Sequence, residues 1–214
     1  MLEPVKHLFE GAYRDAGKGA GKSTDTKLSL TIKHTDGAVE DLADARSLTD
    51  EQAVSYLKQA KSGKLQWNAY ISVRKDTPQV IIDTLAGAGE NVENLSLVMQ
   101  VRKAQQAMST ESRGNCDGKH GNNVRKHAMT PEEVVEIVNN LDDPNVVILQ
   151  TNRHNTNGDS LPNTVAVFVE YNKNNKEGLA VIEFESSINP EFIGTEYGDT
   201  SYHTVVTVFE PDVE

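Results

Sequence analysis

The final 88 residues, from His127 onward, follow one pattern: a single amphipathic helix and then four short apolar segments. Thr130 is a good N-cap, and Pro131 suits the first position of a helix. The apolar residues that follow recur at helical spacing, so the sequence predicts a helix over residues 131–141. This helix ends before Pro144, because the residue that precedes a proline is pushed out of the α region.

The four segments after this helix are rich in β-branched and aromatic residues and are separated by turns of Asn, Gly and Asp. They predict strands at 146–149, 165–169, 179–184 and 205–209. The connections are too short for crossover helices, so an antiparallel meander is the economical topology. The sequence therefore predicts an α+β fold in which one helix packs on one face of a curved four-stranded sheet.

The rest of the chain divides into three further parts. Residues 1–26 end in a Gly/Lys-rich linker, residues 27–110 form a small α+β module, and residues 111–126 form a flexible, basic, Gly/Asn-rich loop before the helix-plus-sheet domain at 127–214. Within the module, strands are predicted at 28–33, 65–73 and 95–99, and helices at 50–60, 78–85 and 101–108.

Composition limits the class of protein. The chain is 37% hydrophobic and 25% charged, which is ordinary for a globular protein. No apolar run reaches membrane-spanning length, and residues 1–11 lack the apolar core of a signal peptide, so we expect no membrane partner and a cytoplasmic location. Cys116 is the only cysteine, which excludes an internal disulfide and a multi-cysteine zinc site.

The acidic excess lies entirely in the C-terminal half. Residues 1–110 contain 14 Lys/Arg and 14 Asp/Glu, whereas residues 111–214 contain 7 and 18. Such a surface repels phosphate backbones, because cationic side chains supply most of the free energy of nucleic-acid binding. Either a narrow basic cleft around Arg125 and Lys126 guides one RNA, or the domain binds a basic protein partner.

Three short motifs in this half resemble a known group. They are KHAMTPEE at 126–133, DPNVVIL at 143–149 and VVTVF at 205–209. Together with the element order, they resemble the nuclease-like C-terminal domains of phage MuF-type proteins, within the broader barnase, EndoU, colicin and RelE-like group. The resemblance extends over about residues 70–212. It implies a nuclease-like fold, and Thr207 matches the small hydroxyl position of the family motif.

Metal-independent RNA cleavage needs a general base, a general acid and a cation or donors on the phosphate. His127 is the most plausible proton-transfer group, since histidine titrates near neutral pH. The alternative is a structural role, in which the His127 side chain forms hydrogen bonds with nearby backbone groups at the start of the helix. His203 and Tyr202 face the same cleft if the sheet curls as in the resembling family, and otherwise form a solvent-exposed edge.

The remaining candidates are a hydroxyl and three cations. Thr204 and Thr207 differ by three positions, so a regular strand points them to opposite faces, and Thr207 is the preferred one. Arg125 is the natural phosphate clamp, with Lys126 and Arg153 as weaker candidates, although isolated cations are commonly just solvated.

Other chemistries have weaker support. Residues 16–23 satisfy a loosened phosphate-loop pattern, but a working loop leaves a buried strand and opens a helix, and here the order is reversed. His154 with Asp159, or Glu183 with Glu185, offers metal ligands without any recognised spacing. We therefore expect neither a metal nor another cofactor.

Two functions remain. The first is a phage- or mobile-element-derived RNase-like domain that cleaves RNA without a metal and uses His127 as general acid or base. The second is a non-catalytic acidic binding protein, either an inhibitor or nucleic-acid mimic that acts on a host nucleic-acid-binding enzyme or a structural module of a larger phage protein. The charge of −11 motivates the second hypothesis.

Overall fold

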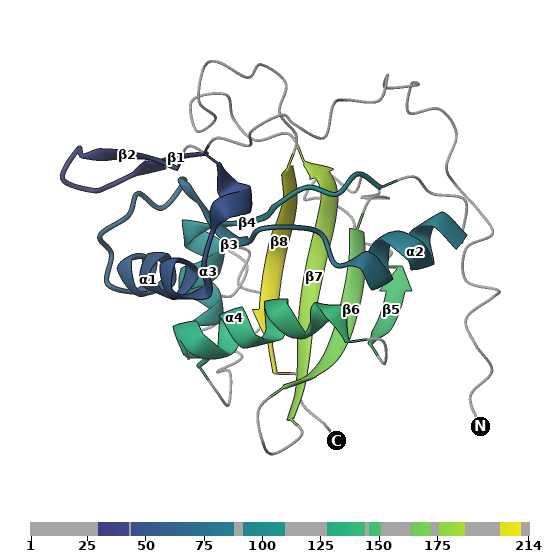
Figure 1. Cartoon of the computed structure of the whole chain (residues 1–214). Coiled ribbons are helices and arrows are strands. Elements are labelled where there is room, and N and C mark those ends of the chain that lie inside the picture. The colour runs from purple at the N-terminus through teal and green to yellow at the C-terminus, as the bar shows by residue number, and fades with distance from the viewer. Residues whose placement is uncertain are drawn as a thin grey trace, which may run out of the picture.

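The structure is a computed structural model of the whole chain (Figure 1). It describes residues 30–42, 44–87, 92–109, 128–143, 146–150, 164–171, 176–186 and 202–210. These residues form a mixed α+β fold, which is the class that the sequence predicts. They contain a small two-stranded sheet and a larger sheet of six strands rather than the predicted four.

The first half of the chain alternates strands and helices. A hairpin of β1 (Leu30–Lys33) and β2 (Val39–Leu42) precedes a 3-10 turn, η1 (Ala45–Ser47), and the helix α1 (Asp50–Lys61). β3 (Tyr70–Arg74), α2 (Gln79–Gly87), β4 (Leu97–Gln100) and α3 (Val101–Ala107) follow.

The second half begins with α4 (Pro131–Asn139) and the 3-10 turn η2 (Asn140–Asp142). Thr130 and Glu133 form a capping box at the start of α4: the Thr130 hydroxyl accepts from the Glu133 amide, and the Glu133 carboxylate accepts from the Thr130 amide. The strands β5 (Val147–Gln150), β6 (Thr164–Tyr171), β7 (Lys176–Ser186) and β8 (Tyr202–Phe209) complete the described chain.

The large sheet joins strands from both halves in the order β3-β4-β8-β7-β6-β5. β5 to β8 pair antiparallel with their neighbours in sequence, and β3 pairs antiparallel with β4. β4 and β8 pair in parallel and connect the two groups. The elements on either side of the expected boundary at 111–126 therefore share one sheet, while residues 110–127 lie outside the described part.

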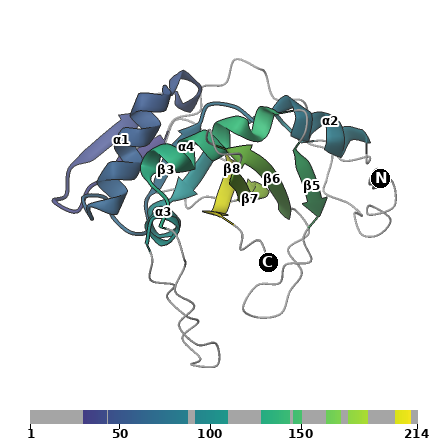
Figure 2. The ribbon, with the colours of Figure 1, turned by 90° about the horizontal axis from the view of Figure 1, so that it is seen from below.

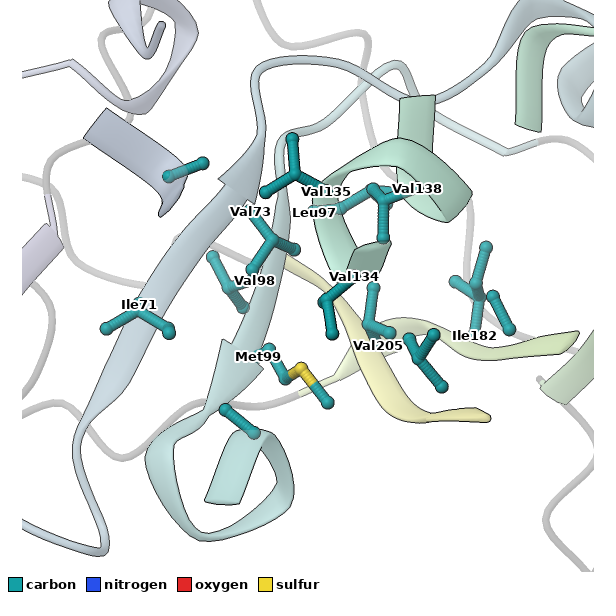
Figure 3. Packing of buried hydrophobic residues seen from close by; sticks show 14 of the residues in the cluster. Ile71, Val73, Leu97, Val98, Met99, Val134, Val135, Val138, Ile182 and Val205 are labelled. Carbon is teal, nitrogen blue, oxygen red and sulfur yellow. The ribbon is translucent and has the colours of Figure 1, made fainter. Parts of the chain in front are cut away.

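One face of this sheet is packed against helices. Figure 2 shows α1 and α4 on the same side of the sheet. The apolar stripe of α4, including Val134 and Val138, belongs to a buried cluster that also contains Ile182 of β7 and Val205 of β8 (Figure 3). We call this the helix face. A second, smaller apolar cluster of Ala166, Leu179 and Val181 lies on the opposite face, which we call the second face.

Candidate functional site

Two of the residues expected to take part in catalysis, Tyr202 and His203, begin strand β8 and are fully buried, with 0% of each residue exposed. The structure therefore places them neither on a solvent-exposed edge nor in an open cleft.

His203 is held by its surroundings. Its Nε2 lies 2.8 Å from the carbonyl oxygen of Glu93, which only accepts, so Nε2 carries the hydrogen. Its ring meets the ring of Phe184 edge-on, with the centroids 4.9 Å apart. Burial lowers the pKa of His203 to about 4, and the bond to Glu93 opposes this shift. His203 is thus neutral at physiological pH, and its contacts are those of a core residue.

Tyr202 has a similar position. Burial, and secondarily the charge of Asp44, raises the pKa of its phenol, so Tyr202 stays protonated at neutral pH. A protonated phenol without solvent access cannot serve as a base for a substrate in bulk solvent.

Thr207 lies on the second face of the sheet. It pairs with Val181 of β7, which belongs to the second-face cluster, and it is partly exposed. Thr204 pairs with Glu183, two residues from Val181 on the same strand, so Thr204 also faces this side. The prediction that Thr204 and Thr207 face opposite sides is wrong. The pairing of β8 with β7 shifts between Val181 and Ile182, and this bulge inserts one extra residue between the two threonines.

The pairing also aligns a row of five side chains on the second face, of which all but the buried Val98 are polar. Across the sheet, the row reads Ser72, Val98, Thr204, Glu183 and Thr164, from β3, β4, β8, β7 and β6 in turn. Residues directly opposite each other in neighbouring strands point to the same face. The Glu183 side chain therefore lies between those of Thr204 and Thr164 on the two adjacent strands.

Two hydroxyls of this row are buried with unused hydrogen-bonding capacity. Neither Ser72 Oγ nor Thr204 Oγ1 has a hydrogen-bond partner within the part of the chain that the structure describes. Ser72 is fully buried, whereas Glu183 and Thr204 are partly exposed. A buried hydroxyl without a partner costs free energy, so such groups are commonly found where a ligand or ordered water completes the bonding.

Tyr70 belongs to the same region, two residues before Ser72 on β3 and on the same face. Burial raises the pKa of the Tyr70 phenol, and the charge of Glu183 raises it further. The phenol is thus a proton donor within electrostatic reach of the carboxylate. Glu183, Tyr70 and the hydroxyls of Ser72, Thr204 and Thr207 form what we call the second-face site.

The other expected site residues, His127, Arg125, Lys126 and Arg153, lie outside the described residues, as do Cys116, residues 16–23, His154 and Asp159. Of the three expected site residues that the structure describes, Tyr202, His203 and Thr207, only Thr207 lies at the second-face site.

From the sequence, Glu183 is a candidate only as a metal ligand, and neither Ser72 nor Tyr70 is among the candidate site residues. The alternation of β3, with Ile71 and Val73 apolar, places Tyr70 and Ser72 on one strand face. Nothing in the sequence, however, indicates that this face continues onto that of β7.

The described residues contain no group of three or more His, Cys, Asp or Glu side chains suited to a metal. None of the described helices is long and apolar enough to cross a membrane. Comparisons of the chain with protein-family models, with curated proteins and with solved structures gave no match.

Proposed function

We propose that the chain is a phage- or mobile-element-derived, RNase-like domain that cleaves RNA without a metal, with the second face of the sheet as its substrate surface. The observation that carries the proposal is the position of Glu183 on this face, between Thr204 and Thr164 and on the same side as Thr207. This is the one place in the described chain where we find a carboxylate and several hydroxyls on a shared, partly exposed sheet face.

The proposed chemistry divides the proton transfers between two residues. Glu183 accepts the proton of the 2′-hydroxyl, and His127 protonates the leaving 5′-oxygen. The partly exposed Thr207 hydroxyl donates to a phosphate oxygen, and Arg125 offsets the phosphate charge, with Lys126 and Arg153 as further cations. Carboxylate, imidazole and guanidinium suffice for this reaction without a metal ion.

The proposal is tested with wild-type protein, His127→Ala and Glu183→Gln against total tRNA and ribosomal RNA in chelator, followed by sequencing of new ends. We expect discrete cuts by wild type and a loss of about 100-fold or more in each variant, since a positioned acid or base contributes about 10²- to 10⁴-fold. His34→Ala and Glu177→Gln are matched controls. His34→Ala removes an imidazole at the β1–β2 hairpin turn, and Glu177→Gln removes a carboxylate at the exposed end of β7. Intact RNA with excess wild-type protein contradicts the proposal.

A second function, a non-catalytic acidic binding protein, is favoured by the burial of Tyr202 and His203. These residues are held in the core, where they stabilise the fold rather than contact a substrate. In that case, residues 111–214, which carry the whole excess of acidic residues, bind a basic protein such as a host nucleic-acid-binding enzyme. Its association must weaken strongly with added salt, and an affinity that is insensitive to salt contradicts this function.

A further inference from the structure

A large aromatic side chain stands exposed outside the second-face site. Trp67 is the only tryptophan of the chain, and 60% of it is exposed. Tryptophan buries more apolar area than most side chains, and exposed tryptophans are therefore common in contact surfaces.

The backbone around Trp67 is fixed on both sides. The amide of Gln66 donates to the carbonyl of Lys33 in β1, and the amide of Arg102 in α3 donates to the carbonyl of Trp67, each over 2.9 Å. The neighbouring Leu65 and Ala69 are buried. Trp67 is thus presented by an anchored segment, so little conformational entropy is lost when a ligand binds.

A cation accompanies the indole ring. The guanidinium carbon of Arg102 lies 5.9 Å from the centroid of the Trp67 ring, within the range of a cation–π interaction. Arg102 is itself exposed, so its charge remains available to an anionic ligand that approaches Trp67.

Two exposed lysines extend this charge. Lys61 ends α1, and Lys64 lies three residues before Trp67. The side-chain amide of Gln105 in α3 donates to the carbonyl of Ala60 over 2.9 Å, which holds α3 beside the end of α1.

Negative charge near the patch comes from outside its own segments. Glu132 of α4 is ion-paired with Lys58 and also interacts electrostatically with Lys61. The contributing segments, residues 52–75 and 94–110, contain no Asp or Glu, although the chain carries −11 overall. The nearby hairpin holds three acids, and each carboxylate accepts a hydrogen bond: Asp36 from the Ala38 amide, Glu40 from the Tyr56 hydroxyl and Asp41 from the Thr31 hydroxyl. We call the exposed residues Lys61, Lys64, Trp67 and Arg102 the tryptophan patch.

We propose that the tryptophan patch binds single-stranded nucleic acid. A base stacks on the indole of Trp67, while Lys61, Lys64 and Arg102 contact the flanking phosphates. Surfaces that bind single strands without sequence preference combine these two elements, an aromatic platform and cations along the backbone. A duplex fits less well, because its bases are already stacked on each other. This proposal goes beyond the proposed RNase activity, because binding at the tryptophan patch requires no catalytic residue.

The test uses the intrinsic fluorescence of Trp67, which reports this position alone. We expect titration with a short oligo(dT) at low salt to change the fluorescence saturably. The affinity falls with salt, with a slope of about −0.7 per phosphate contact for a single strand. Oligo(dT) lacks the 2′-hydroxyl that metal-independent cleavage requires, so failure of this binding is distinguishable from failure of the proposed RNase activity.

Variants then separate stacking from charge, with binding measured by the anisotropy of labelled oligo(dT). Trp67→Ala should weaken binding by about tenfold, since base stacking is worth about 1–3 kcal/mol. Arg102→Gln should weaken binding and lower the salt slope. Val39→Ala, at the other exposed large hydrophobic residue among those described, and Lys75→Gln, at an exposed lysine outside the patch, should leave binding unchanged.

Three results would overturn the proposal. The first is the absence of any fluorescence change with oligo(dT) at low salt. The second is Trp67→Ala binding as tightly as wild type, with folding checked by circular dichroism. The third is polyphosphate of equal charge giving the same fluorescence change and competing equally, which would indicate an anionic partner without bases, such as an acidic protein segment.

Discussion

Arg74, at the end of β3, is ion-paired with Asp142, which follows α4 in the other half of the chain. The same guanidinium donates to the carbonyls of Val138 and Asn139, each over 3.1 Å. These carbonyls belong to the last turn of α4, where a helix leaves acceptors unsatisfied and its dipole favours a cation. Arg74 therefore caps α4 from a strand 64 residues away in sequence.

Removal of this cap should destabilise the whole sheet. Arg74 is 8% exposed, and Arg74→Ala leaves two helix carbonyls without their donor, at a cost of about 2–3 kcal/mol in the free energy of unfolding. Arg74→Lys should cost less, because the charge remains, but still about 1 kcal/mol, because an ammonium group cannot reproduce the planar set of donors. Urea unfolding measures both values.

Asp142→Asn provides the control for this prediction. The Asp142 side chain is 53% exposed, so its pair with Arg74 is partly screened, and the loss should be below about 1 kcal/mol. If Asp142→Asn costs as much as Arg74→Ala, the ion pair rather than the helix cap is the source of the stability.

The buried His203 should make the fold sensitive to mild acid. Burial lowers its pKa in the folded state to about 4, below the value of 6.5 expected in the unfolded chain. The unfolded state thus binds more protons between these values. The contribution of His203 to stability is fully present above pH 6.5 and is lost as the pH falls toward 4, and at most about 3 kcal/mol is at stake.

This linkage is measured by urea unfolding of wild type and His203→Gln between pH 7.5 and 4.5. Glutamine retains a donor for the Glu93 carbonyl but does not titrate in this range. We expect the stability of wild type to fall more steeply with decreasing pH than that of the variant. Parallel curves would mean that His203 already titrates normally in the folded state.

Gly178 of β7 should not tolerate a side chain. A Cβ atom there would lie 2.6 Å from Cδ1 and 2.7 Å from Cγ1 of Ile137 in α4, and 3.1 Å from Cδ1 of Tyr171. We expect Gly178→Ala to destabilise the protein by about 1–3 kcal/mol, because the helix would have to move away from the sheet. Denaturant unfolding measures the loss.

A double-mutant cycle identifies the contact responsible. Ile137→Ala removes both clashing carbon atoms and alone costs about 2–5 kcal/mol through the cavity it leaves. In the double variant, the new methyl group occupies part of that cavity, so the combined loss should be smaller than the two single losses added. If the loss in the double variant equals the sum of the two single losses, α4 is not the element that excludes a side chain at position 178.

The local elements of this fold are readable from the sequence, but their long-range pairing is not. The predicted helix at 50–60 is observed at 50–61, because Thr49 and Gln52 form a capping box whose residues are visible in the sequence. The parallel pairing of β4 with β8 connects Leu97 to His203, and no local periodicity specifies a partner so distant. Without that pairing, Ser72 and Glu183 cannot be assigned to one face.

The bulge in β8 limits prediction of the site in the same way. Strict alternation assigns Thr204 and Thr207 to opposite faces, whereas the extra residue turns both to the second face. A bulge depends on how two strands pair rather than on one strand's composition, so the Val-rich sequence of β8 contains no signal for it.

The unsatisfied hydroxyl of Ser72 gives a prediction that separates a structural role from a functional one. Among the described residues, Ser72 Oγ finds no partner, and its residue is fully buried. Ser72→Ala removes this desolvated group while keeping the Cβ atom, so we expect the protein to become about 0.5–2 kcal/mol more stable in urea unfolding. Native residues that cost stability are commonly retained at sites of function. If Ser72 serves the second-face site, the stabilised Ser72→Ala variant should also lose RNA cleavage. A variant that is destabilised instead would show that an ordered water or another partner satisfies the hydroxyl in solution.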